Sequence, residues 1–142
     1  MKAKIFVPAS IGNVGPGFDT LGLAIEGLGD TFEVELHDGP DEVVQVSGID
    51  KDHVPKDPSK NVSVIAAQKL LAKNNLKYGV KLTIERQLPI SGGLGSSAAA
   101  SVGGALAAGY AADIIFNQKD ILEASLAGES FVSGYHLDNI AS

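Results

Sequence analysis

The 142-residue chain has 44% hydrophobic and 20% charged residues, the composition of one globular domain that can bury a core, so an intrinsically disordered chain is excluded. Its formal net charge is −6 and its 11 Lys and Arg residues are scattered, so it has no basic patch and we do not expect nucleic acid as a partner. The absence of cysteine excludes disulfides, thiolate zinc sites and cysteine nucleophiles.

The beginning of the chain is predicted to form a strand and then a loop. Apolar residues dominate 3–9, which we expect to be a strand, and a glycine-dense loop follows at 11–17. Pro8 and Ser10 interrupt the first apolar run, which is not typical of a signal peptide. No apolar stretch reaches the roughly 18 residues that a membrane span needs. We therefore expect a soluble, cytoplasmic protein with no membrane partner.

Alternation of apolar and charged residues predicts the next strands. In 31–37 the apolar side chains fall on one face and the charged ones on the other, the pattern of a half-buried strand. Turn-forming residues at 38–41 favour a hairpin in which 43–46 pairs with 31–37. The polar segment 50–59 is expected to be a surface loop, and renewed alternation predicts another strand at 79–85.

The chain also shows the start signals of three helices. Asp57-Pro58 supplies an N-cap and a first helical residue for a helix that ends near Asn74. The second helix, at 96–112, consists almost wholly of Ala, Ser and Gly, so it can approach a sheet or another helix closely. The third, at 118–128, is capped by Asn117. Because no repeat or linker divides the chain, we expect one α+β domain.

The most specific feature is a glycine-rich loop that opens the second helix. Three glycines lie within 92–95 and are followed by Ser96 and Ser97. The unpaired amides of 94–98 and the positive end of the helix dipole would form a cradle for an anion. The two hydroxyls can cap the helix, or one can reach a Mg²⁺ ion that accompanies phosphates. A glycine turn before an ordinary capped helix is the alternative that binds nothing.

Two known phosphate loops can be compared with this segment. A Walker A loop is excluded because Ser96, and not Lys, follows Gly95. The Gly-x-Gly-x-x-Ala pattern at 93–98 fits a dinucleotide-binding loop, so an oxidoreductase of the Rossmann type is the alternative. Its context is weaker, because 87–91 separates the expected strand from that pattern. Asp113 lies about twenty residues further on, but at the end of a helical pattern and not of a second strand.

Three segments of the chain resemble a known family. The run Gly-Leu-Gly-Ser-Ser-Ala-Ala at 93–99 is similar to the second motif of the galactokinase, homoserine kinase, mevalonate kinase and phosphomevalonate kinase (GHMP) superfamily. Segments 8–24 and 129–139 resemble the homoserine kinases of that superfamily in particular. The resemblance implies that 1–142 is an N-terminal ATP-binding domain. Its fold would be α+β and ribosomal protein S5 domain 2-like, with a mixed or antiparallel sheet on which helices pack.

The resemblance also implies the roles of individual residues. The loop would wrap the phosphates of ATP, a serine of the loop and a later glutamate would hold Mg²⁺, and the first and third segments would bind the substrate. The implied ATP-binding residues are Pro89, Ile90, Ser91, Gly92, Gly93, Leu94, Gly95, Ser96, Ser97 and Ala98. The implied metal ligands are Ser97 and Glu129, the substrate-binding residues are Asn13, Asp19, His136 and Asn139, and the catalytic residues are Asn139, Glu129 and Ser97.

Residue chemistry alone leaves alternatives to these roles. Asn13 and Asp19 are common turn formers, Glu129 could be a solvated charge at a helix end, and His136 could be structural. Some relatives use an aspartate near the third segment as a general base. Asn139 stands at that place here, so catalysis by positioning is favoured over proton abstraction by a carboxylate.

The resemblance predicts phosphoryl transfer from ATP to the side-chain hydroxyl of L-homoserine, which gives O-phospho-L-homoserine for threonine biosynthesis. Another small alcohol acceptor, a dinucleotide-dependent oxidoreductase and a non-catalytic nucleotide-binding module remain alternatives. A homodimer is compatible with the resemblance. Since members of the superfamily are roughly twice this long, we expect a C-terminal domain to be missing and these 142 residues alone to have little or no kinase activity.

Overall fold

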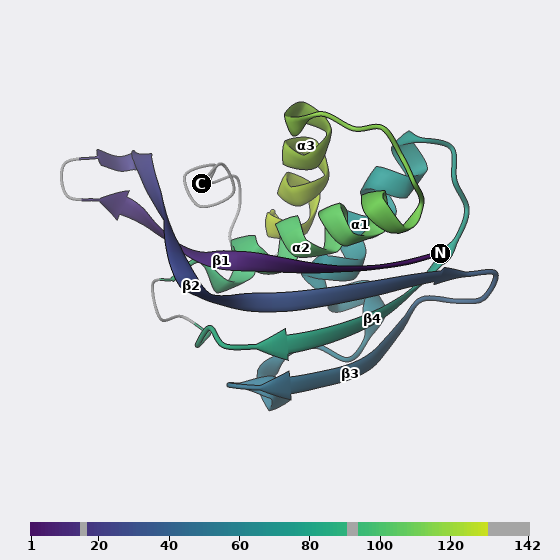
Figure 1. The fold of residues 1–142 in the computed structure, drawn as a ribbon, viewed down its shortest axis with the longest axis horizontal. Coiled ribbons are helices and arrows are strands. Elements are labelled where there is room, and N and C mark those ends of the chain that lie inside the picture. Colours follow the sequence, from purple (N-terminus) through teal and green to yellow (C-terminus); the bar gives the residue numbers. More distant parts are fainter. Residues whose placement is uncertain (15–16, 91–93, 131–142) are drawn as a thin grey trace.

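A computed structural model describes the backbone of residues 1–14, 17–90 and 94–130, and the side chains of 1–11, 24–90 and 94–130. In this part of the chain a 4-stranded sheet has the order β1-β2-β4-β3, and three α-helices pack with it (Figure 1). The strands are β1 Lys2–Val14, β2 Gly17–His37, β3 Glu42–Gly48 and β4 Gly79–Arg86. The helices are α1 Val62–Lys73, α2 Ser96–Ala111 and α3 Gln118–Glu129, with short 3-10 turns at Lys51–His53 and Pro58–Lys60.

The sheet is mixed, as the resemblance implied, but the pairing of β3 differs from the predicted hairpin. β2 pairs antiparallel with β1 on one side and with β4 on the other, and β3 pairs parallel with β4. Asp41 joins the segment before β3 to β4 and α1: its Oδ1 accepts hydrogen bonds from Val80 N at 2.9 Å and Gln68 Nε2 at 2.7 Å. The segment that leads into β3 is thereby held beside β4. Helix α1 makes the crossover connection that the parallel strands β3 and β4 require.

The prediction of a glycine-dense loop at 11–17 is also wrong for those of its residues that the structure describes. β1 continues to Val14 and β2 begins at Gly17, so the two strands form a long antiparallel ribbon that projects from the sheet (Figure 1). Backbone pairing drives this extension, because Ile11 lies opposite Leu23 and Gly12 opposite Gly22. A side-chain pattern cannot reveal such pairing where glycines supply the backbone groups.

The predicted helices are confirmed, with one displaced start. Asp57 and Pro58 do form a cap and a first residue, but of the 3-10 turn at Pro58–Lys60. Asn61 caps α1 instead, where its side chain accepts from the amides of Ser63 and Val64. At the start of α3, the predicted cap by Asn117 is present as a full capping box.

Helix α2 lies at the centre of the domain, where its small residues allow close packing. It contacts β1, β2, α1 and α3. A Cβ atom on Gly103 would stand 2.2 Å from the ring of Phe32, and one on Gly104 would stand 2.1 Å from the carbonyl oxygen of Ser63. Both gaps are too small for an added methyl group, so these glycines fix the distance of α2 from β2 and α1. The N-terminus of α2 is therefore held firmly.

Candidate phosphate-binding site

The N-terminus of α2 has the backbone geometry of an anion cradle. Gly95 occupies the N-cap in the left-handed conformation, with φ 71°, which glycine adopts at little cost. No side chain caps this helix end, so capping, one of the two roles that the sequence left open for Ser96 and Ser97, is not observed. Among the described residues, the backbone hydrogen bonds outside helices and strands do not use the amides of 96–98. These donors and the helix dipole favour a negatively charged group here.

Two residues that the sequence predicted as metal ligands lie together at this helix end. Ser97 Oγ donates a hydrogen bond of 2.7 Å to Glu129 Oε2. Ser97 belongs to the first turn of α2 and Glu129 is the last residue of α3, so the packing of these helices brings the pair together. Glu129 is only 7% exposed, which excludes the alternative of a solvated charge at a helix end.

The chemistry of this pair suits a hard divalent cation. A carboxylate and a hydroxyl are oxygen ligands of the kind that Mg²⁺ accepts. In the part of the chain that the structure describes, no group of three or more His, Cys, Asp or Glu residues could hold a metal by itself. Ser97 and Glu129 would thus need further oxygens from phosphate or water, which is usual for Mg²⁺ bound with a nucleotide.

A buried arginine holds the neighbouring serine. Arg86 Nη2 donates to Ser96 Oγ at 2.6 Å and to the carbonyl oxygen of Leu88 at 2.5 Å. Arg86 is 8% exposed, although its residue type is rarely buried. Sequence reasoning missed this residue. The signal was its place on β4, because Arg86 continues the buried, apolar alternation of Val80, Leu82 and Ile84.

Asp30, a second buried charge that sequence reasoning missed, fixes the chain just after β4. It is 1% exposed, and its Oδ1 accepts hydrogen bonds from Gln87 N at 2.7 Å and Leu88 N at 2.9 Å. Burial raises the pKa of Asp30, while these two hydrogen bonds and the charge of Arg86 oppose the shift. The carboxylate therefore acts as a fixed acceptor for the backbone that leads into the glycine-rich loop.

The structure also describes four further residues that were predicted to bind ATP, which are Pro89, Ile90, Leu94 and Ala98. Ile90 donates its amide to Asp50 Oδ2 at 2.9 Å, and Leu94 accepts from the amide of Ser10 at 2.9 Å through its carbonyl oxygen. Pro89 lies between Leu88, whose amide is held by Asp30, and Ile90, and Ala98 is buried in the first turn of α2. Ser91, Gly92 and Gly93 lie outside the described residues.

The predicted substrate-binding residues are less fully described. Asn13 lies in β1 and Asp19 in β2, so both belong to strands and not to the loop in which they were expected, but their side chains are outside the described set. His136 and Asn139 also lie outside the described residues. Their roles stay predictions.

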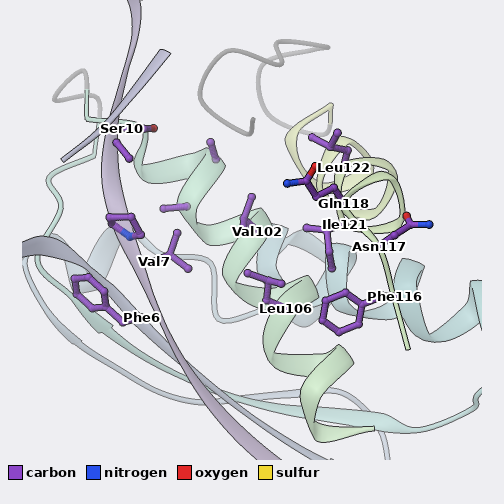
Figure 2. Close-up of a pocket in the computed structure, with 14 residues that line it drawn as sticks. Phe6, Val7, Ser10, Val102, Leu106, Phe116, Asn117, Gln118, Ile121 and Leu122 are labelled. Atoms are coloured by element: carbon purple, nitrogen blue, oxygen red, sulfur yellow. The ribbon is translucent and has the colours of Figure 1, made fainter. Parts of the chain in front are cut away.

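An apolar cavity of about 610 Å³ lies beside the first turns of α2. Figure 2 shows Phe6 and Val7 of β1 on one side, Ile121 and Leu122 of α3 on the other, and α2 between them. Ser10 and Ala98 also line it, and Ser10 donates its amide to the carbonyl oxygen of Leu94 in the glycine-rich segment.

Among the residues that the structure describes, no helix is both long and apolar enough to cross a membrane.

Known proteins with similar sequences define the class of this chain. The family model "GHMP kinases N terminal domain" matches residues 61–142, and the chain belongs to this family. The mixed sheet, whose described part has a single parallel pair, β3–β4, agrees with that family and not with the parallel sheet of a Rossmann oxidoreductase.

Individual relatives agree with the family. The chain is 42% identical to a homoserine kinase of Pyrococcus abyssi over 99% of its own length and 46% of that protein. It is 40% identical to a homoserine kinase of Corynebacterium glutamicum over 99% of its length and 43% of that protein. The crystal structure of a homoserine kinase from Cytophaga hutchinsonii superposes with a TM-score of 0.90 and 31% identity over 99% of this chain and 45% of that one. The chain thus spans less than half the length of these relatives.

Proposed function

We propose that the whole protein transfers the γ-phosphate of ATP to the side-chain hydroxyl of L-homoserine, which gives O-phospho-L-homoserine for threonine biosynthesis in the cytoplasm. The observation that carries this proposal is the contact of 2.7 Å between Ser97 Oγ and Glu129 Oε2, beside the N-terminus of α2. A glycine-rich segment, the amides at the start of α2 and a hydroxyl–carboxylate pair form a set suited to a nucleotide with its metal ion. The similarity to homoserine kinases supports L-homoserine as the acceptor.

Each part of the site has a role in this proposal. The loop from Pro89 to Ala98 binds the ATP phosphates through backbone amides, and Ser97 and Glu129 hold Mg²⁺. When bound, the ion neutralises the negative charge that phosphoryl transfer develops. Asn13 and Asp19 together with His136 and Asn139 bind the amino acid.

Positioning supplies the rest of catalysis in this proposal. Phosphoryl transfer requires in-line placement and charge compensation more than covalent participation by the protein. Asn139 orients the attacking hydroxyl through its amide, which cannot act as a strong base. Asn139→Ala should therefore reduce turnover far more than Asp138→Asn does, and the opposite order would favour a carboxylate base.

The proposal is tested first by binding. A fluorescent ATP analogue is titrated into the protein with and without Mg²⁺, and NADH is titrated in parallel. We expect Mg²⁺-dependent binding of the ATP analogue and no saturable binding of NADH. Preference for NADH would overturn the proposal in favour of an oxidoreductase. A coupled assay of the full-length protein with homoserine, mevalonate and galactose then identifies the acceptor.

Glu129→Gln is the sharpest variant for the metal site. It retains the size of the side chain and removes the charge that would hold the cation, so we expect turnover of the full-length protein to fall on the order of 100-fold or more. Glu123→Gln is the matched control, because it makes the same change on an exposed turn of the same helix. Equal activity of the two variants would remove Glu129 from the proposed machinery.

A further inference from the structure

The guanidinium of Arg86 joins the two sides of the glycine-rich loop. Its Nη2 contacts the Leu88 carbonyl oxygen, which precedes the loop, and Ser96 Oγ, which follows it. Leu88 is itself held by Asp30 through its amide. A single side chain therefore links the end of β4 to the start of α2, the two elements that flank the loop in the chain.

Stability alone does not account for a cation at this place. The residues before it on the same face of β4, Leu82 and Ile84, are buried and apolar, and an apolar residue would avoid the cost of burying a charge. The positive end of α2 adds to that cost. Asp30 compensates only in part, because no ion pair within 4.0 Å joins the two groups among the described residues, and the buried Nε of Arg86 has no hydrogen-bond partner there.

The adjacent residues Ser96 and Ser97 therefore make different contacts. Ser97 Oγ points to Glu129 and the expected metal, whereas Ser96 Oγ accepts from Arg86. A hydroxyl that accepts a hydrogen bond from a guanidinium is a poor ligand for a cation, because the positive group lies against its lone pairs. It can still donate its own hydrogen to a phosphate oxygen.

We propose that Arg86 is a positioning residue for the phosphates of ATP: it fixes Leu88 and Ser96, so that the end of β4 and the start of α2 keep the separation that a bound polyphosphate needs. In this proposal Ser96 links the start of α2 to Arg86, and Ser97 is the metal ligand. The inference rests on the proposed ATP-binding function and extends it to a residue outside the loop itself. The two N–H groups of Nη2 allow both acceptors to be held at once.

The test compares Arg86→Met, Arg86→Lys, Ser96→Ala and the double variant Arg86→Met/Ser96→Ala in the full-length protein. Dissociation constants are measured for Mg·ATP and for adenosine, and KM is measured for each substrate. We expect Arg86→Met to weaken Mg·ATP binding on the order of 10-fold or more, as loss of a charge-assisted contact does. Adenosine binding and the KM for the acceptor alcohol should hardly change, and Lys should restore only part of the loss.

The double variant distinguishes positioning from two independent contacts. If Arg86 acts through Ser96, the loss in Arg86→Met/Ser96→Ala is smaller than the product of the two single losses. A full product would overturn the proposal, as would Mg·ATP binding equal to wild type in Arg86→Met or, should that variant not fold, in Ser96→Ala.

Two further comparisons isolate the role of Arg86. Asn117→Ala serves as a control for lost stability, because it removes the cap at the end of α3 opposite to Glu129 and should leave Mg·ATP binding unchanged. Equal weakening of adenosine and Mg·ATP by Arg86→Met would reduce Arg86 to a structural role. A wild-type protein that does not bind Mg·ATP would overturn the proposed function itself, a result distinct from the failure of the variants.

Discussion

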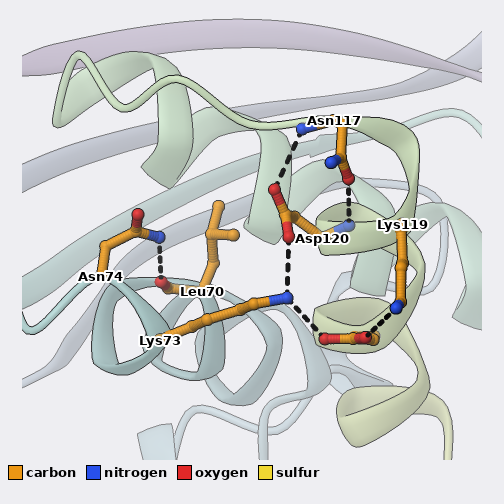
Figure 3. Close-up of polar contacts among 7 residues, drawn as sticks. Leu70, Lys73, Asn74, Asn117, Lys119 and Asp120 are labelled. Atoms are coloured by element: carbon orange, nitrogen blue, oxygen red, sulfur yellow. Dashed lines mark hydrogen bonds and ion pairs between the residues drawn. The ribbon is translucent and has the colours of Figure 1, made fainter.

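Two sets of charged residues connect parts of this molecule that are distant in sequence, and they differ in burial. The buried set consists of Asp30 and Arg86, which hold the backbone at Gln87 and Leu88 that leads into the glycine-rich loop. The exposed set consists of Lys73 on α1 and of Asp120 and Glu123 on α3 (Figure 3). Lys73 Nζ lies 2.7 Å from Asp120 Oδ1 and 2.6 Å from Glu123 Oε2, distances as short as those in the buried set.

Distance alone is therefore no guide to what these contacts contribute. The hydrogen bonds from Lys73 lower the pKa values of Asp120 and Glu123, and the same bonds raise the pKa of Lys73. The three side chains remain 41%, 22% and 44% exposed, so water and salt screen them and the ordered geometry costs side-chain entropy. Asp30 has no such access to water, so its partners would stay unpaired if it were removed.

Asp30→Ala should have the largest effect on stability. It removes the acceptor of two backbone N–H groups and leaves Arg86 without a nearby carboxylate, a loss of about 2–4 kcal/mol in the free energy of unfolding. Urea denaturation followed by circular dichroism measures it. Asp30→Asn is the matched control, because its side-chain oxygen can still accept both hydrogen bonds. A loss below about 0.5 kcal/mol for Asp30→Ala would remove the distinction between the two sets.

The pH dependence of stability, compared between wild type and Asp30→Asn, gives a second test of Asp30. The pKa of Asp30 is raised in the folded state, so folding favours its protonated form. Its contribution to stability is full below the ordinary pKa of 3.8 and declines as the pH rises through the raised value. Asp30→Asn does not titrate there, so its stability relative to wild type should increase from about pH 3 to pH 7. An opposite slope would mean that hydrogen bonds, and not burial, dominate this carboxylate.

Asn117→Ala should have an intermediate effect, because it removes a backbone cap from the exposed side of the molecule. Asn117 Oδ1 accepts from Asp120 N at 3.0 Å, and Asp120 Oδ2 accepts from Asn117 N at 3.0 Å. Loss of such a cap costs about 1 kcal/mol, which thermal and urea unfolding can resolve. Asn117→Ser preserves the capping group and should recover most of the loss. A cost as large as that of Asp30→Ala would contradict the ranking by burial.

The sequence predicted local structure more reliably than it predicted partners. Alternation located the strand around Phe32, and the cap of α3 followed from Asn117, because both signals lie within the element itself. The predicted pairing of β3 with β2 was wrong. Its observed neighbour β4 is joined to the segment before β3 by the hydrogen bond from Val80 N to Asp41, and Val80 lies 39 residues further along the chain. Contacts across such separations are not encoded in periodicity.

The candidate site divides in the same way. The glycine-rich turn and the helix dipole were predictable from residues 92–97, and the resemblance paired Ser97 with Glu129. The support of the segment before the loop was not predicted, because Asp30 contacts Gln87 and Leu88 from 57 and 58 residues away. An arginine on the buried face of β4 was the one local sign of that support.

Lys73→Met should have the smallest effect, although it breaks two of the shortest contacts in the described structure. In low salt we expect a slight fall in the thermal midpoint. In 1 M NaCl, where screening reaches about 3 Å, the difference from wild type should disappear. It should also disappear as the pH falls below the ordinary pKa values of 3.8 for Asp120 and 4.5 for Glu123, and as the pH rises above 10.5, the ordinary value for Lys73, through its raised value.

Lys69→Met is the control for the Lys73 variant, because it makes the same change at another position of α1 for which the structure gives no ion pair among the described residues. If Lys73→Met destabilised the protein as strongly as Asp30→Ala, and did so in high salt, the bridge between α1 and α3 would act as a structural support equal to the buried set. The helix end that carries Glu129 would then depend on the bridge at the other end of α3. If the two lysine variants behave alike, the position of Glu129 follows from the packing of α3 against α1 and α2, in which the surface charges take little part.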